Sequence, residues 1–179
     1  MISNILTGAA VTSRDKQPSD DGLSPEAVDR RSLSLRYRAT VASTREAIGK
    51  VTDELLKVAE QVGCDEDEIT DLSIALREAL ANAIIHGNEN DPGKRVLIRC
   101  YSHDALGLLV AIRDEGKGFD PDDVPDPTAA ERIHLHHGRG VYMMRELMDQ
   151  VLHRKGGREV VLYKKPSKGA DDGSRGSGD

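Results

Sequence analysis

Cysteine is scarce in this chain of 179 residues, which contains only Cys64 and Cys100. The two residues form no close pair and do not have the spacing of a metal-binding cysteine pair. The low count also favours a reducing compartment, where thiols stay free.

Long apolar runs and dense basic blocks are also missing. No segment approaches the ~20 apolar residues that a membrane-spanning helix needs. The first residues, MISNILTGAAVTSR, contain neither a basic leader nor a long apolar stretch, so we expect no secretory signal. The net charge is -6 and the pI about 5.5, whereas a protein that binds nucleic acid through phosphates is usually basic. We therefore expect a cytoplasmic protein that binds neither membranes nor nucleic acid directly.

Composition divides the chain into one patterned domain and two polar tails. Residues 1–30 and 166–179 are rich in Ser, Asp, Gly and Pro and have little apolar periodicity, so we expect both segments to be disordered. Residues 31–165 contain the hydrophobic patterns. With 37% hydrophobic residues in the whole chain, this length suits a single domain with a core.

Within this domain, the periodicity of apolar residues predicts the order strand, helix, helix, strand, strand, loop, helix, strand, strand. Alternating apolar residues indicate strands, and three-four spacing indicates helices. The expected strands cover residues 33–41, 95–101, 106–113, 152–155 and 158–165. The expected helices lie between a Ser43–Glu46 capping box and Gly63, from Asp65 and Glu68 to about His86, and over residues 140–151.

Short turns between neighbouring strands predict antiparallel pairing. The stretch SHDA at 102–105 is one such turn. We therefore predict an α+β fold, a two-layer sandwich in which helices cover one face of a mixed, mainly antiparallel sheet.

A ladder of polar residues interrupts the apolar second helix in the stretch EALANAIIHG. Glu78, Asn82 and His86 are spaced four residues apart, and such residues differ by only ~40° in direction around a helix. One interpretation is a solvent-facing stripe. The other is the rim of a pocket, because the ladder combines three chemistries and its neighbours are Ala and Ile.

The stretch IRDEGKGFDP follows a predicted strand and places Asp114, Gly116 and Gly118 in the pattern D-x-G-x-G. Glycine allows a backbone to approach a ligand closely, and a carboxylate at a strand end can accept a hydrogen bond from an amino group. The alternative is an ordinary turn. A calcium loop fits poorly, because glycines occupy the positions where oxygen ligands are expected.

A third stretch, HHGRGVYMM, places Gly138 and Gly140 before the last predicted helix. A helix N-terminus favours phosphate, and Arg139 is a second candidate contact. The pattern lacks the third glycine of a dinucleotide fingerprint and the Lys-Ser/Thr of a P-loop. Three histidines nearby have no acid or cysteine partner, which favours exposed lid residues over metal ligands: His134, His136 and His137.

In this order, E-x-x-x-N on a helix, D-x-G-x-G after a strand and G-x-G opening a helix resemble the nucleotide-binding (Bergerat) fold of the GHKL ATPases. The stretches EALANAIIHGNEN, AIRDEGKGFDP and GRGVYMMRELMDQV are similar to the single-domain anti-sigma factor serine kinases of that superfamily. The similarity spans about residues 33–165. It implies ATP and Mg²⁺ as cofactors.

The resemblance implies a role for each motif. Asn82 would ligate Mg²⁺ at the ATP phosphates, and Glu78 would act as the general base toward a serine of a partner protein. Asp114 would accept a hydrogen bond from the adenine amino group, with Gly116 and Gly118 beside the base.

The remaining motif residues would lie at the phosphate end. A lid over about residues 120–138 would precede Gly138, Arg139 and Gly140 at the phosphates, and His86 would lie near the site. His136 and His137 stand where the family often has a basic or hydroxyl residue. This departure affects the expected transfer rate more than binding.

By the same resemblance, the protein would phosphorylate an anti-anti-sigma (STAS) protein and sequester a sigma factor, as a homodimer. The alternative is a nucleotide-dependent partner switch without kinase activity; Glu78 favours the kinase, because a pure binder needs no base. A histidine kinase ATPase domain is disfavoured because no helix with a phosphoacceptor histidine precedes the fold. DNA-topology and mismatch-repair functions are disfavoured because the transducer domain is missing.

Overall fold

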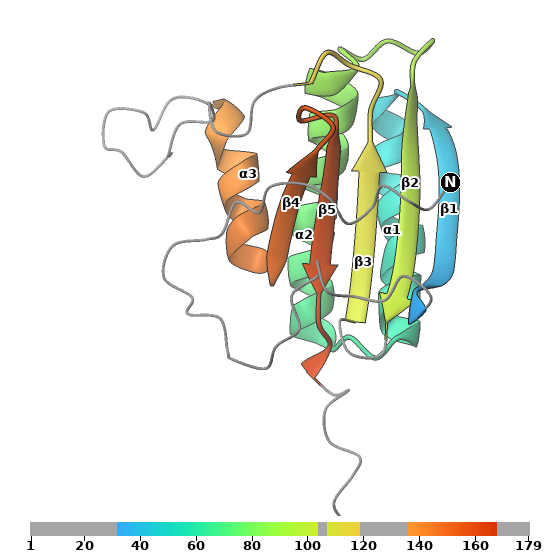
Figure 1. Cartoon of the computed structure of the whole chain (residues 1–179), viewed down its shortest axis with the longest axis vertical. Helices are drawn as coiled ribbons and strands as arrows, with labels where there is room; N and C mark the ends of the chain where they lie inside the picture. Colours follow the sequence, from blue (N-terminus) through green and yellow to red (C-terminus); the bar gives the residue numbers. More distant parts are fainter. Residues whose placement is uncertain (1–31, 104–106, 119–135, 168–179) are drawn as a thin grey trace, which may run out of the picture.

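A five-stranded sheet in the order β1-β2-β3-β5-β4 forms one layer, and helices α1 and α2 lie behind it (Figure 1). The computed structural model describes residues 32–103, 107–118 and 136–167. The strands are β1 (Ser34–Ala42), β2 (Arg95–His103), β3 (Gly107–Arg113), β4 (Gln150–Arg154) and β5 (Glu159–Lys164). The helices are α1 (Arg45–Gln61), α2 (Glu66–Ala81), the π-helix η2 (Asn82–Gly87) and α3 (His136–Leu147).

All four strand pairings in this sheet are antiparallel. Cys100 pairs with Val110, which in turn pairs with Leu162, so the inward-facing residues of adjacent strands align. A register shift between Leu35 and Tyr37 interrupts the β1–β2 ladder. The predicted α+β sandwich with a mainly antiparallel sheet is confirmed.

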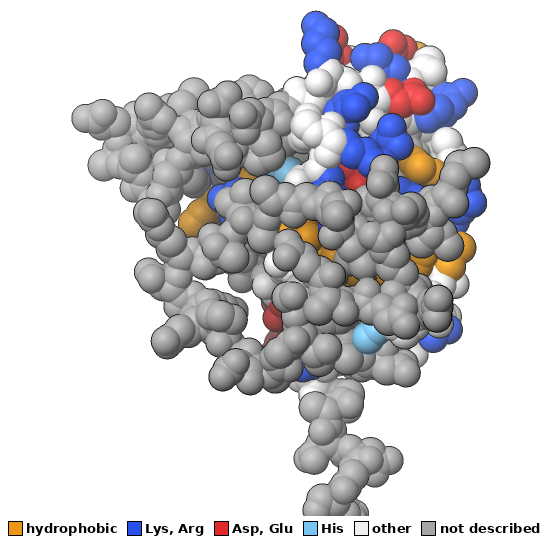
Figure 2. Space-filling model, viewed as in Figure 1, with side chains coloured by type: hydrophobic (Ala, Val, Ile, Leu, Met, Phe, Trp, Pro, Cys, Tyr) orange, Lys and Arg blue, Asp and Glu red, His pale blue; other side chains and the backbone are white. Residues whose placement is uncertain are grey.

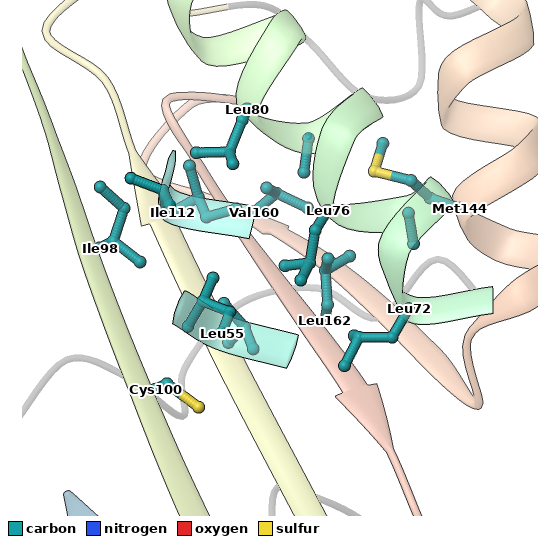
Figure 3. Packing of buried hydrophobic residues seen from close by; sticks show 14 of the residues in the cluster. Leu55, Leu72, Leu76, Leu80, Ile98, Cys100, Ile112, Met144, Val160 and Leu162 are labelled. Carbon is teal, nitrogen blue, oxygen red and sulfur yellow. The ribbon is translucent and has the colours of Figure 1, made fainter. Parts of the chain in front are cut away.

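The main hydrophobic core lies between the sheet and the helices. Helix α2 turns one apolar stripe toward β3 and β5, while α3 contributes Met144 from the side (Figure 3). Burying one such leucine contributes about 1.5–3 kcal/mol. Labelled core residues are Leu55, Leu72, Leu76, Leu80, Ile98, Cys100, Ile112, Met144, Val160 and Leu162.

A second apolar cluster occupies the sheet face opposite to the helices. Residues of alternate parity on the central strands form it, so β3 and β5 are apolar on both faces. This explains why both strands appear in the sequence as continuous apolar runs. The members are Tyr101, Leu109, Ala111, Leu152, Val161 and Tyr163, with Leu33 packed against them.

The predicted start of α2 is confirmed, and that of α1 is wrong. Glu68 N–H donates to Asp65 Oδ1 at 3.0 Å, and Asp65 N–H donates to Glu68 Oε2 at 2.8 Å, which is a complete capping box. The N-cap of α1 is Thr44, not Ser43. Ser43 is buried, and its hydroxyl makes a long 3.4 Å hydrogen bond to the Ile84 carbonyl.

The third helix begins and ends about four residues earlier than the predicted range of 140–151. Gly138 and Gly140 therefore lie inside α3, not before it. Val151 belongs to β4, where it pairs with Leu162. Val151 continues the three-four spacing of the apolar residues of α3, but its side chain is buried as part of the sheet.

Other predictions fall partly outside the described residues. Residues 1–31, 104–106, 119–135 and 168–179 lie there, and they include the N-terminal tail, the end of the SHDA turn and most of the lid. Ser102 and His103 belong to β2, which is longer than predicted. At the other end, Ser167 N–H donates to Glu68 Oε1 at 2.7 Å, so contacts with the domain continue past Lys165. None of the helices in the described ranges combines the length and apolarity needed to cross a membrane.

Candidate functional site

The polar ladder lies where the second helix changes its winding. Helix α2 is α-helical through Ala81 and continues as η2, whose wider turn is closed by the Asn88 N–H bonding to the Ala83 carbonyl at 2.9 Å. Single π-turns within helices are frequent at functional sites. Glu78 and Asn82 are half-buried, whereas His86 is exposed. The regular α-helical offset that predicted the ladder therefore ends at Asn82.

Helix α3 passes directly over Glu78 and Asn82. A Cβ atom added to Gly140 would lie 2.6 Å from Glu78 Oε2 and 3.6 Å from Asn82 Nδ2. The structure thus brings Gly140 against two residues, Glu78 and Asn82, from which it is far apart in sequence. Gly140 provides room for the acid, because any side chain there would displace it.

The position of Gly138 also differs from the prediction. It lies in the first turn of α3, where backbone N–H groups have no partner within the helix. Arg139 is exposed at the same turn. The N-terminal end of α3 therefore still has backbone N–H groups and the cationic Arg139, which together suit the binding of an anion. Both glycines are nevertheless part of the helix.

Asp114 begins the loop that follows β3. Its side chain is buried, and its Oδ1 accepts a hydrogen bond from Gly116 N–H at 2.7 Å. Its backbone N–H donates to the Arg158 carbonyl at 3.0 Å. Burial raises the pKa of the Asp114 carboxyl, although the Gly116 N–H group and the charge of Arg158 act in the opposite direction. A buried carboxylate of this kind gains from a ligand that donates a hydrogen bond to it.

Three glycines allow the elements around Asp114 to come close. A Cβ atom on Gly87 would lie 2.6 Å from the Asp114 carboxyl carbon, and one on Gly116 would overlap the Gly87 carbonyl oxygen. Gly118 has a φ of +79°, and a Cβ there would overlap the Gly156 carbonyl. The end of η2, the loop after β3 and the β4–β5 turn are thus packed backbone against backbone.

Basic side chains gather on the end of the molecule that carries these loops, although the chain as a whole is acidic (Figure 2). Lys94 and Arg158 both act on Asp114 and oppose the rise in its pKa. Desolvation of the carboxyl is the larger effect.

The sequence patterns did not single out two parts of this site, namely Asn88 and the β4–β5 turn. Asn88 is fully buried at the end of η2, and its side chain bonds to the backbones of Arg95 and Glu115. Its position directly after the ladder, in HGNEN, was the available signal.

The donor set around Glu78 fits a magnesium ion that is held mainly by a nucleotide. Among the described residues, no group of three or more His, Cys, Asp or Glu side chains is arranged to hold a metal ion. Mg²⁺ typically takes one or two protein oxygens and completes its shell with phosphates and water. The side-chain amide of Asn82 can provide one such oxygen, next to the carboxylate of Glu78.

Comparison with known proteins supports this interpretation of the fold. The histidine kinase-like ATPase domain family matches residues 41–164, which include the end of β1, all of β2 to β5 and every motif discussed above. Fold and family match together define a histidine kinase-like ATPase domain.

Similar proteins of known name indicate which group of histidine kinase-like ATPase domains this chain resembles. The anti-sigma F factor of Geobacillus stearothermophilus is 31% identical over 125 residues, covering 69% of this chain and 82% of the relative. The serine-protein kinase RsbW of Bacillus subtilis is 36% identical over 118 residues, covering 62% and 72%. The anti-sigma F factor of Oceanobacillus iheyensis is 31% identical over 121 residues, covering 66% and 80%. The chain belongs to the anti-sigma factor kinase family.

Proposed function

We propose that this protein is an ATP-dependent serine kinase and anti-sigma factor in a partner-switching pathway. It phosphorylates a serine of an anti-anti-sigma (STAS) protein and, in the alternative state, sequesters a sigma factor. It acts in the cytoplasm as a homodimer, with Mg²⁺ as the metal. The observation that carries the proposal is the convergence of Glu78, Asn82 and Gly140 at the α2–α3 contact.

The two halves of the site bind the two ends of ATP. Asp114 accepts a hydrogen bond from the adenine amino group, and Gly116 and Gly118 allow the backbone to lie against the base. The first turn of α3, with Gly138 and Arg139, binds the phosphates. Asn82 would hold Mg²⁺, which would neutralise charge on the phosphates when bound.

Glu78 acts as the general base. It accepts the proton of the partner's serine hydroxyl as that oxygen attacks the γ-phosphorus, and the bond to the bridging β–γ oxygen breaks to release ADP. Helix α3 holds the carboxylate in place, because the backbone at Gly140 limits its movement. His86 lies exposed one π-turn beyond Asn82, at the edge of this site.

A partner switch that binds nucleotide without transferring phosphate is the second candidate. A switch of that kind needs Asn82 and Asp114 but does not need a carboxylate at position 78. The close packing of Gly140 against Glu78 Oε2 favours the kinase, since it places an acid beside the metal-binding amide.

The test measures ATP binding and phosphate transfer separately. Calorimetric titration with ATP, with and without Mg²⁺, should show magnesium-dependent binding that Asn82→Ala abolishes. Glu78→Gln should keep MgATP affinity within about threefold, because it removes only the base, and should lower phosphate transfer to a STAS-domain protein by about 10²–10⁴-fold.

Glu146→Gln is the matched control, because Glu146 is an exposed acid on α3. It should leave both binding and transfer unchanged. Wild-type protein that binds MgATP but transfers no phosphate to any STAS protein tested would identify the non-kinase switch. Wild-type protein that binds no ATP would refute both functions.

A further inference from the structure

Asn88 connects three segments of the nucleotide site through one buried side chain. Its Oδ1 accepts a hydrogen bond from Glu115 N–H at 2.8 Å, and its Nδ2 donates to the Arg95 carbonyl at 3.0 Å. Its own backbone N–H closes the π-turn on Ala83 at 2.9 Å. The residue is 0% exposed, so water does not replace these bonds.

These contacts determine where the Asp114 loop lies. Glu115 directly follows Asp114, so the Asn88–Glu115 hydrogen bond anchors the backbone one residue beyond the carboxylate. Gly116 N–H then bonds back to Asp114 Oδ1 at 2.7 Å. On the other side, Gly87 leaves just enough space for the carboxyl group. The orientation of Asp114 therefore depends on the distance between η2 and its loop, which Asn88 sets.

We propose that Asn88 is a positioning residue that gives the nucleotide site its preference for adenine over guanine, an inference that rests on the proposed binding of ATP at Asp114. A carboxylate accepts a hydrogen bond from the amino group of adenine, but it repels the carbonyl oxygen that guanine has at the equivalent position. This discrimination requires a carboxylate that cannot turn away or retreat. Asn88 acts through Asp114 and does not itself touch the base.

The alternative is that Asn88 only stabilises the fold. The two interpretations differ in one measurable quantity, the ratio of GTP to ATP dissociation constants. A loss of stability alone lowers the amount of folded protein, and it leaves the preference of the folded fraction unchanged. A mispositioned Asp114 lowers the preference itself.

The experiment measures magnesium-dependent binding of ATP and of GTP to the full chain by calorimetry. Asn88→Leu, of similar volume and without hydrogen-bonding groups, should lower the preference for ATP by about tenfold or more, mainly by weakening ATP binding. Asn88→Asp, which keeps an oxygen for Glu115 N–H, should retain most of it. If the leucine variant does not fold, Asn88→Ala takes its place, because the smaller side chain lets water reach both groups.

Two controls make the result decisive. Thr52→Val removes a buried 2.8 Å hydrogen bond to the Ile48 carbonyl within α1, and it should leave the ratio unchanged even if it lowers stability. Asp114→Asn should abolish the preference. If Asp114→Asn abolishes it while Asn88→Leu and Asn88→Ala do not, the role of Asn88 is refuted and the proposed function stands. If the wild type binds no ATP, the proposed function fails first.

Discussion

Gly140 of α3 lies against Glu78 of α2, so closely that an added Cβ atom would be 2.6 Å from Glu78 Oε2. Two helices that are joined by a long segment of chain meet at this point, and the contact consists of a backbone and a carboxylate. The position of the proposed base therefore depends on the absence of a side chain on the opposite helix.

Replacing Gly140 by alanine should reduce phosphate transfer by about 10- to 100-fold, because a displacement of catalytic groups by about 1 Å has effects of that size. Alanine is the better helix former by ~1 kcal/mol, so any loss of activity cannot come from weaker helix propensity. Transfer of phosphate from labelled ATP to a STAS protein measures the effect.

Gly49→Ala is the matched control for this change. Gly49 lies inside α1, and nothing lies within 4 Å of an added Cβ. The variant should keep wild-type activity and unfold at equal or higher denaturant concentration. Equal activity of the two alanine variants would show that the α2–α3 contact does not control transfer.

Lys164 links the end of the sheet to two helices. Its Nζ donates to Asp71 Oδ2 and to the Leu147 carbonyl, both at 2.9 Å. Leu147 is the last residue of α3, where carbonyls lack partners within the helix. Lys164→Met should therefore lower the free energy of unfolding by about 1–3 kcal/mol, which urea denaturation would measure.

Asp71→Asn tests which of the two contacts matters more. Asp71 is partly exposed, so solvent screens its ion pair, and the loss should stay below about 1 kcal/mol. A loss as large as that of Lys164→Met would indicate that the ion pair dominates over the bond to the Leu147 carbonyl.

His153 of β4 should make the fold sensitive to mild acid. Burial, and secondarily the charge of Arg145, lowers the pKa of His153 from 6.5 to about 4. Between these two pH values the unfolded chain binds more protons than the folded one, so stability falls as the pH decreases. The loss by pH 4 should reach about 3 kcal/mol.

His153→Gln should remove this part of the pH dependence. Urea unfolding of both proteins at pH 7, 6, 5 and 4.5 gives the difference between them, in which the titration of Asp114 and the other carboxyl groups cancels. Parallel stability curves over this range would contradict the assignment to His153.

A structural feature could be predicted from the sequence where the residues that form it are neighbours in the chain. The Asp65–Glu68 capping box and the left-handed Gly63 after α1 needed only their own segment. The order of the elements followed from apolar periodicity. The motif residues Glu78 and Asn82 were recognisable from their spacing on one helix turn.

Features that depend on contacts between distant parts of the chain could not be predicted from local sequence patterns. Ser43 has the spacing of a cap, yet it turns inward because the π-turn leaves the Ile84 carbonyl within reach. The glycines of HHGRGVYMM suggested a loop before a helix, but Gly140 is helical and is explained by its contact with Glu78. The Asn88 side chain bonds to the backbones of Arg95 and Glu115, and Glu115 is 27 residues away along the chain.

The central strands β3 and β5 should open far more slowly than the loops that are attached to them. Both are buried on their two faces and paired on both sides, so we expect their amide protons to exchange with solvent only when the entire domain unfolds. The Asp114 loop begins directly after β3, and the turn that contacts this loop directly precedes β5. If nucleotide binds beside Asp114 as proposed, it can enter and leave by local rearrangement of these connections while the sheet stays folded.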